Sequence, residues 1–331
     1  MNKNIMRDKM TDVEQSHEMV RRRKYMYYFI VNEYSGSGNA RLLWHKIQVM
    51  LRDGEIAYKA WKTEYAGHAT KLAQHISKFE EEKIHLVVVG GDGTISEVLN
   101  GITSFDKVYL GVIPTGSGND FIHGVGIPRD TREAFDLLIS SKGDMTIDLG
   151  RVTFSDQTSK IFGISSGIGM DAYICKKVHD SKLKKILNFF NRGDTVYLMK
   201  TIQTLLTLKM INVSVRFDEE EEIFLKKGVF LAAMNVKTEG GGIPMAPMAS
   251  VHDGNISICI GYEVRRWKLF YILAKLVKGQ HVGRREFLIR DCQKIAVHYE
   301  EPVEVHIDGE PMGEHTDIQM ECVANQLHML I

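Results

Sequence analysis

Gly90-Gly91-Asp92-Gly93-Thr94 directly follows the apolar run Ile84-His85-Leu86-Val87-Val88-Val89. The run predicts a buried strand, and the apolar residues from 95 to 102 then recur at the spacing of one helix face. Glycines let the backbone approach phosphate oxygens closely, and N–H groups at a helix N-terminus favour negative charge. The single acid of the turn, Asp92, cannot bind an anion and is instead a candidate for metal binding or proton transfer. This combination is typical of phosphoryl transfer.

Composition narrows the class of protein. A chain of 331 residues is long enough for two domains, and 44% hydrophobic with 25% charged residues is ordinary for a globular protein. The formal net charge of zero gives no support to a nucleic-acid partner. The 4 cysteines form no Cys-x-x-Cys pair, which favours reduced thiols and a cytoplasmic protein. The sequence shows neither a signal-peptide core near its start nor an apolar run long enough for a transmembrane segment.

The first half alternates strands and helices. Strands are predicted over 25–31, 84–89 and 110–113, and helices over 41–51, 68–79 and 130–139, the last opened by a capping box of Asp130 and Glu133. This alternation predicts a mainly parallel sheet with helices on its faces, an α/β nucleotide-binding domain over residues 24–145. Residues 1–23 are a polar N-terminal extension. Ligands of such sheets bind beyond the carboxyl ends of the strands.

The second half of the sequence has a different pattern of predicted elements. Strand-like runs dominate residues 146–331 and predict an antiparallel β-sandwich, in which the C-terminal segment either stays or returns to the first domain. Helical spacing interrupts only near 170–205 and 266–278, and the acidic run 218–222 is expected to be a solvated hairpin tip. The predicted strands are 147–154, 160–169, 211–217, 229–235, 256–261, 295–299, 303–307 and 327–331.

Short motifs with glycine, hydroxyl and acidic residues follow successive strands. They are Asn32-Glu33-Tyr34-Ser35-Gly36-Ser37-Gly38, Thr63 with Gly67, Gly90–Thr94, Pro114-Thr115-Gly116-Ser117-Gly118-Asn119-Asp120-Phe121 and the late Asp308-Gly309-Glu310. Each is weak alone, but together, on successive strand ends of one sheet, they are expected to converge on one cleft. Gly-x4-Gly-Lys-Ser/Thr is absent. The stretch 167–172 matches a relaxed dinucleotide fingerprint, but it lies in the β-rich half without a following parallel unit.

The ordered set resembles the diacylglycerol kinase catalytic-domain family, with the bacterial soluble lipid kinases as the nearest branch and sphingosine and ceramide kinases as relatives. The resemblance covers roughly residues 24–331. It implies an ATP-binding α/β domain like that of NAD kinases, a β-sandwich that helps to bind lipid, and an active site in the cleft between them. It also implies ATP as a substrate and Mg²⁺ as a cofactor.

Individual positions follow from the resemblance. It matches Glu310 to the proton acceptor of the bacterial branch, whereas the sphingosine-kinase relatives favour Asp92 as the base, so both remain candidates. It matches Asp92, Asp120 and Asp148 to a magnesium–water network. The implied ATP-contacting residues are Asn32, Ser35, Gly36, Thr63, Gly90, Gly91, Asp92, Gly93, Thr94, Ser96, Ser117 and Asn119. A second, structural magnesium loop is implied at Ser250, Asp253 and Asn255, where an apolar residue is more common than Asn255.

Two positions depart from the family pattern. Glu33 stands where a proline is common and would be awkward beside phosphates unless it points away or faces the metal, and Ser117 replaces a threonine but keeps the hydroxyl. The alternative function is an NAD kinase or phosphofructokinase-like enzyme with a soluble acceptor, because those enzymes also use Gly-Gly-Asp-Gly. A non-catalytic lipid- or nucleotide-binding regulator is a third reading, and the retained acids argue against it.

The lipid acceptor implies transient contact with a membrane surface. The lysines at 176, 177, 182, 184 and 185 and the basic cluster 21–24 are candidates for that contact. Trp267, Phe270, Tyr271 and Ala274 are instead expected to pack their helix onto the sandwich. The sequence leaves open which lipid alcohol is phosphorylated, and a homodimer is compatible with it.

Overall fold

The computed structural model describes residues 25–141, 143, 145–180 and 209–331, and it divides into two units. The described residues up to Ile122, residues 126–146 and Leu327–Ile331 form unit 1, and His123–Val125 with Ile147–Gln326 form unit 2. The predicted extension 1–23 and the basic positions 21–24, 182, 184 and 185 lie outside the described residues.

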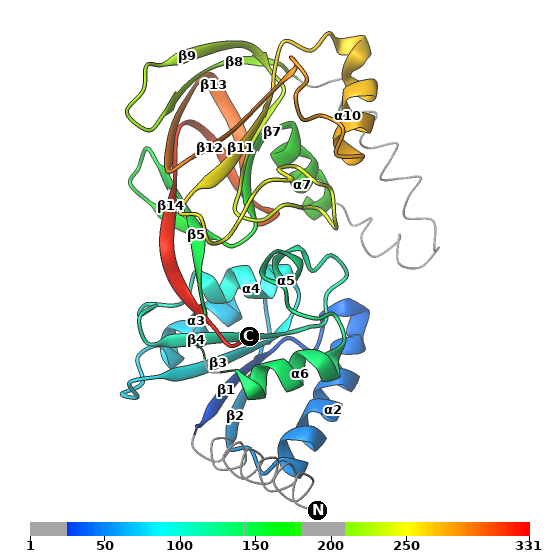
Figure 1. The fold of residues 1–331 in the computed structure, drawn as a ribbon, viewed down its shortest axis with the longest axis vertical. Coiled ribbons are helices and arrows are strands. Elements are labelled where there is room, and N and C mark those ends of the chain that lie inside the picture. The colour runs from blue at the N-terminus through cyan, green and yellow to red at the C-terminus, as the bar shows by residue number, and fades with distance from the viewer. Residues whose placement is uncertain (1–24, 142, 144, 181–208) are drawn as a thin grey trace, which may run out of the picture. The chain divides into compact units, whose positions relative to one another are not determined.

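Unit 1 is built on a parallel sheet in the order β14-β4-β3-β1-β2, to which β14 contributes only its last residues (Figure 1). The register pairs Val31 with both Val89 and Lys62, and Gly90 with Pro114, so the carboxyl ends of four strands lie at one edge. The strands are β1 (Tyr27–Val31), β2 (Tyr58–Lys62), β3 (Ile84–Gly90), β4 (Val108–Pro114) and β14 (Glu310–Met329).

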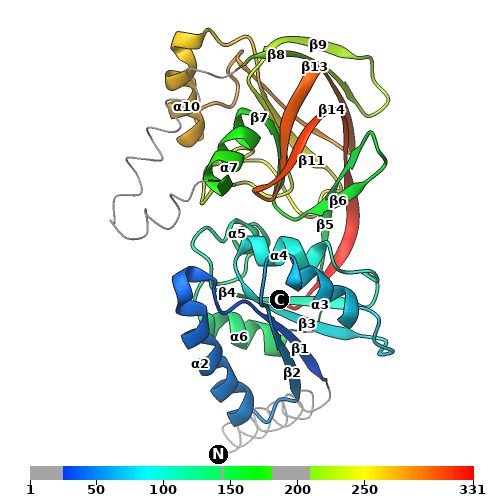
Figure 2. The same cartoon turned by 180° about the vertical axis from the view of Figure 1, so that it is seen from behind.

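Helices cover both faces of this sheet (Figures 1 and 2). Helices α2 (Asn39–Asp53) and α6 (Thr131–Ser140) enclose one core, in which Trp44 packs against Phe29. Helices α3 (His68–Ile76) and α4 (Asp92–Leu99) pack together on the other face, and α5 (Asp120–Val125) follows β4. The predicted cap of α6 is confirmed, because the Asp130 carboxylate accepts the N–H groups of Arg132 and Glu133.

Unit 2 is an antiparallel β-sandwich, which confirms the predicted fold class. Its longest path runs β12-β11-β10-β7-β13-β14, and two apolar clusters fill it, one beneath α7 (Met170–Asp180) and α10 (Leu269–Val277). The further strands are β5 (Met145–Phe154), β6 (Ser159–Phe162), β7 (Ser165–Gly169), β8 (Ile211–Phe217), β9 (Ile223–Gly228), β10 (Phe230–Met234), β11 (Ile256–Gly261), β12 (Phe287–Cys292) and β13 (Lys294–Ile307). Among the described residues, each helix is too short or too polar to cross a bilayer.

Two sequence predictions in this half were wrong, and one open alternative is decided. The single strand expected over 160–169 is two strands, β6 and β7, because the backbone between them turns its N–H groups to the Asp308 carboxylate. The C-terminal segment, expected either to stay in the sandwich or to return, does return, since the end of β14 pairs in parallel with β4. Trp267, Phe270 and Tyr271 are exposed, since Leu269, Ile272 and Leu276 form the buried face of that helix.

The acidic run is where it was expected. Residues 218–222 connect β8 to β9 and are all exposed, which confirms a solvated hairpin tip.

Asp308 organises the junction of β6 and β7 and gives a first test. Its carboxylate accepts the N–H groups of Gly163, Ile164 and Ser165 at 3.1, 2.8 and 3.1 Å. Asp308→Ala should lower the free energy of unfolding by about 2–4 kcal/mol in urea titrations, because these amides lose a charged acceptor. Glu219→Ala on the exposed hairpin tip is the control, and equal unfolding midpoints for the two variants would contradict the assigned role.

Candidate active site

Three loops at the carboxyl edge of the parallel sheet pack directly against one another. Asn32, which follows β1, donates from its side-chain amide to the Thr94 hydroxyl at 2.9 Å. A Cβ atom added at Gly36 would lie 2.1 Å from the Thr115 carbonyl oxygen, and one at Gly91 would lie 3.0 Å from the Gly116 Cα. Glycine is therefore required by the contacts between loops, and the loops after β1, β3 and β4 form one surface.

Asp92 lies in the first turn of α4 and holds the beginning of α5. Its two carboxylate oxygens accept the N–H groups of Asp120 at 3.2 Å and Phe121 at 3.3 Å. Burial raises the pKa of Asp92, and the nearby Asp120 carboxylate adds to this, while the backbone donors oppose it. Two adjacent carboxylates in a partly desolvated site are an arrangement that a divalent cation stabilises, and oxygen donors are the ligands that Mg²⁺ prefers. These residues therefore fit a magnesium ion.

The remaining predicted ATP-contacting positions of unit 1 lie around the same edge. Asn119 has the left-handed backbone with φ 59°, and its side chain donates to the Gly116 carbonyl, while Ser117 is exposed. Thr63 is buried at the end of β2. The N-terminus of α3 next to it is already occupied, because the Glu97 carboxylate accepts N–H groups from Gly67 and Ala69 at 2.9 and 3.1 Å.

Glu33, the unusual acid of the first loop, is neutralised within unit 1. Its carboxylate forms an ion pair of 2.8 Å with Lys62 at the end of β2. The repulsion expected between this acid and bound phosphates is therefore reduced by a neighbouring cation.

Asp148 and the predicted second metal loop lie in unit 2 and are joined to each other. The buried Asp148 carboxylate accepts N–H groups from Gly254 and Asn325, each at 2.7 Å. Within the loop, the Asp253 carboxylate accepts the Asn255 N–H, and the Asn255 side chain donates to the Asp253 carbonyl. The Ser250 hydroxyl similarly accepts the His252 N–H. The loop is thus closed by its own hydrogen bonds, and both metal roles stay predictions.

Glu310 begins β14 directly after a two-residue hairpin turn. Asp308 and Gly309 have φ values of 48° and 84°, as a type I′ Asp-Gly turn requires, and Ile307 pairs with Glu310 across it. The Asp-Gly dipeptide is therefore a turn, but it also places an exposed carboxylate at the start of a strand.

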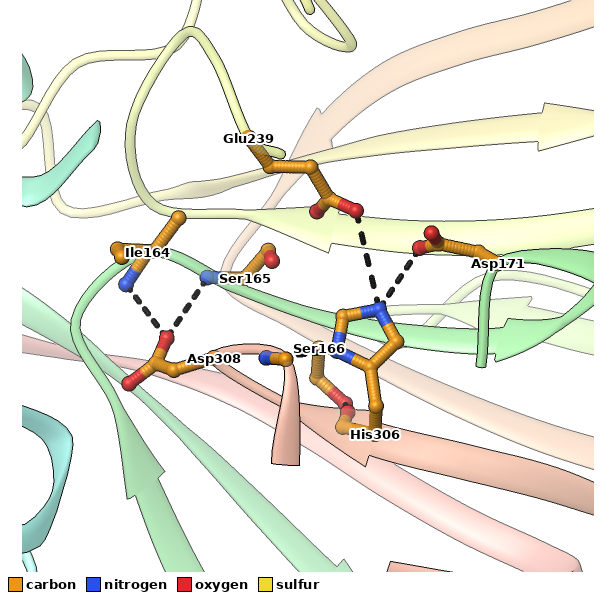
Figure 3. A network of polar contacts seen from close by, with 8 residues as sticks. Ile164, Ser165, Ser166, Asp171, Glu239, His306 and Asp308 are labelled. Carbon is orange, nitrogen blue, oxygen red and sulfur yellow. Dashed lines mark hydrogen bonds and ion pairs between the residues drawn. The ribbon is translucent and has the colours of Figure 1, made fainter. Parts of the chain in front are cut away.

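A buried polar network adjoins this turn and was missed by sequence reasoning (Figure 3). His306 is 1% exposed, its Nε2 lies 2.8 Å from an Asp171 carboxylate oxygen and 3.8 Å from Glu239, and its Nδ1 lies 3.2 Å from the Gly309 amide nitrogen. A Cβ atom at Gly167 would lie 2.1 Å from Asp171 Oδ2, so this glycine makes room for the network. The position of His306, two residues before the Asp308-Gly309 turn, was the available sequence signal.

Burial and the charges of their neighbours shift the pKa values of Glu239, Asp171 and His306. Burial, and then the facing Asp171 carboxylate, raise the pKa of Glu239 to about 8. Burial would also raise the pKa of Asp171, but the contact with His306 holds it below the usual value. Burial lowers the pKa of His306, and the contacts with Asp171 and Glu239 raise it. Because the Gly309 N–H is directed at Nδ1, that nitrogen carries no second proton, and the ring is neutral with its proton on Nε2.

The proton on Glu239 makes stability depend on pH. A carboxyl group with a pKa of about 8 in the folded state and 4.5 when exposed binds more protons folded than unfolded. Its stabilisation is complete below about pH 4.5 and is lost as the pH rises towards about 8. The unfolding midpoint of the wild type should fall over this range, and Glu239→Gln should flatten the decline in thermal melts. Glu219→Gln is the exposed control, and an unchanged slope in Glu239→Gln would contradict the assignment.

Comparisons with known proteins agree with this architecture. The profile of the diacylglycerol kinase catalytic domain matches residues 26–152, and that of the YegS C-terminal NAD kinase beta sandwich-like domain matches residues 164–331. A Bacillus subtilis protein named "Putative lipid kinase YtlR" is 30% identical over 87% of this chain and 94% of its own length. A diacylglycerol kinase of the same bacterium is 28% identical over 81% of this chain and 85% of its own length.

A solved structure shares the fold. The crystal structure of a diacylglycerol kinase from Bacillus anthracis superposes with a TM-score of 0.65 at 22% identity, over 92% of this chain and 96% of that one. The chain therefore belongs to the diacylglycerol kinase catalytic-domain family of lipid kinases.

Proposed function

We propose that this protein transfers the γ-phosphate of ATP to the hydroxyl of diacylglycerol or a related lipid alcohol. The observation that carries the proposal is the joining of three glycine-rich loops around Asp92 in a chain of this family. A relative named diacylglycerol kinase supports the choice of acceptor. Among the loop residues, the ATP phosphates would be held by backbone N–H groups and by the hydroxyls of Ser35, Thr94 and Ser117.

In the proposed function, Asp92 and Asp120 would hold the magnesium ion. When bound, Mg²⁺ neutralises phosphate charge as the phosphoryl group transfers, and it keeps several waters, so water-mediated contacts suffice. Asp148 is left as a water-mediated candidate only, because both of its oxygens already accept backbone N–H groups. The structural ion at Ser250, Asp253 and Asn255 is likewise kept as a secondary proposal.

Glu310 is the proposed general base. It is exposed at the beginning of β14 and can accept a proton from a lipid hydroxyl, whereas both oxygens of Asp92 are already engaged by the N–H groups of α5. The lipid hydroxyl would then attack the γ-phosphorus as its proton passes to Glu310.

Removing either acid tests the two roles separately. Glu310→Gln should lower kcat by about 10²–10⁴-fold, the range typical of a lost general base. Asp92→Asn should also abolish turnover, and in addition weaken the Mg²⁺ dependence of nucleotide binding. The measurement is transfer of ³²P from γ-labelled ATP to diacylglycerol in mixed micelles, with fluorescent-nucleotide titrations at varied Mg²⁺.

Glu314→Gln is the matched control, since Glu314 is another exposed glutamate on β14. It should keep the wild-type kcat. Near-normal turnover in Asp92→Asn would overturn the phosphate site. A wild type that labels NAD or a sugar instead of lipid would replace the proposed acceptor with a soluble one.

The proposal includes transient membrane binding through α10 and the short turn before it. Trp267 and Tyr271 are 71% and 51% exposed, and the Lys268 and Lys275 ammonium groups each lie 5.6 Å from one of these rings. Exposed aromatic rings interleaved with cations suit the boundary between headgroups and acyl chains of an anionic bilayer. Each cation near such a surface contributes about 1 kcal/mol, so inserted rings must add to the affinity.

Vesicle binding tests this surface. The double variant Trp267→Ala/Tyr271→Ala should bind phosphatidylglycerol vesicles about tenfold or more weakly in sedimentation assays, because two interfacial rings are lost. Phe224→Ala removes a similarly exposed aromatic ring from β9 and should bind as the wild type does. Equal weakening in both variants, or none in the double variant, would remove α10 from the membrane-binding surface.

A further inference from the structure

His306 connects the partly buried Asp171 to the turn that precedes Glu310 (Figure 3). Its Nε2 lies 2.8 Å from Asp171 Oδ2, and the Gly309 N–H donates to its Nδ1 at 3.2 Å. The backbone of His306 is also fixed, since the Ser166 hydroxyl donates to its carbonyl at 3.0 Å. The ring therefore bridges α7 and the β13–β14 turn.

The contacts of the ring define one tautomer. Because Gly309 donates an N–H to Nδ1, that nitrogen is an acceptor without a proton. The ring proton then lies on Nε2 and is donated to Asp171. Gly167 permits this contact, because a Cβ atom there would lie 2.2 Å from His306 Nε2.

The same residues invite comparison with a metal site. Ligand atoms of Asp171, Cys175 and His306 lie within 4.8 Å of one another. A metal on Nε2 would require the ring proton to move to Nδ1, where it would face the Gly309 N–H. Metal-bound histidines usually donate their second ring N–H to an acceptor, and here a donor stands in that place. The geometry thus fits a chain of hydrogen bonds from Gly309 through His306 to Asp171 better than a metal centre. We call this chain the relay.

Two independent contacts hold the turn in place. The Asp308 carboxylate accepts three N–H groups from residues 163–165, and the Gly309 amide is held by His306. Glu310 is the next residue. Burial raises the pKa of the Cys175 thiol, the carboxylates of Asp171 and Glu239 add to this, and Glu310 makes a smaller contribution. Glu310 therefore belongs to the same local cluster as the relay.

We infer that His306 is a positioning residue, which orients Glu310 for proton abstraction by holding the Gly309 amide. The inference rests on the proposed function, in which Glu310 is the base. Its physical reason is that Gly309 is a glycine, whose backbone has the most conformational freedom, at the position directly before the reacting carboxylate. An external acceptor removes that freedom. A misplacement of about 1 Å at a reacting group can lower the rate about a hundredfold.

Two substitutions separate the two halves of the relay. In His306→Asn the amide oxygen can take the place of Nδ1 and still accept the Gly309 N–H, whereas in His306→Gln the amide reaches the place of Nε2 and leaves Gly309 without its acceptor. We expect kcat to fall about tenfold to a hundredfold in His306→Gln and to stay within about threefold in His306→Asn. The KM for ATP should not change in either variant. His298→Gln, which alters an exposed histidine of β13, is the control.

A double-mutant cycle tests whether His306 acts through Glu310. In the Glu310→Ala background, His306→Gln should cause no further loss of the residual activity, because the group that it positions is absent. A further loss, or equal kcat values for His306→Gln and His306→Asn, would overturn the inference. Should Glu310→Gln keep wild-type kcat, the proposed base fails. Should Glu310→Gln be inactive while His306→Gln is fully active, the inference fails alone.

A measurement without activity covers variants that fold poorly. Nitrogen chemical shifts of the wild-type ring should report Nδ1 unprotonated and Nε2 protonated, and the Gly309 amide should be protected from hydrogen exchange. That protection should be lost in His306→Gln and retained in His306→Asn. A proton on Nδ1, an unprotected Gly309 amide, or one metal ion per chain that disappears in Cys175→Ala would overturn the relay.

Discussion

Hydrogen bonds from backbone amides to aspartate carboxylates hold the functional loops of both units. Asp92 ties the beginning of α5 to α4, Asp148 ties the loop before β11 to β14, and Asp308 ties the β6–β7 junction to the β13–β14 turn. Each carboxylate uses both oxygens in this way. Loops that carry no regular structure thereby receive fixed positions, on which every proposed contact with nucleotide, metal or acceptor depends.

This constraint changes how acids in a motif are interpreted. An aspartate after a strand can hold a metal, but it can also satisfy backbone amides that would otherwise be buried without a partner. Asp92 satisfies backbone amides in this way. Burial, with a further contribution from the Asp120 carboxylate, raises the pKa of Asp92, so a cation would still stabilise its charged form. Asp148 has two short amide contacts that already account for its burial. An aspartate thus supports a metal site at position 92 more strongly than at position 148.

Short sequence patterns predicted much of the fold, because strands, turns and helix caps depend on interactions between residues close together in the chain. The apolar run of β3, the glycines after it and the cap of α6 each depend on a few neighbouring residues, and all were predictable. The division of strand 160–169 was not, because its cause is Asp308, which lies more than 140 positions away. The aromatic residues of α10 were misassigned since helical spacing alone does not say which face meets the core.

The sequence by itself determined the α/β and β-sandwich classes, the family, and the residues from which a phosphate site can be built. These follow from the periodicity of apolar residues and from the order of short motifs, both of which can be identified without knowledge of the fold. Only the tertiary structure brought Asp171, Glu239 and His306 together, with 135 positions between the first and the last. Partners of buried polar groups are set by strand pairing and by the space that Gly167 leaves open, and spacing along the chain contains neither.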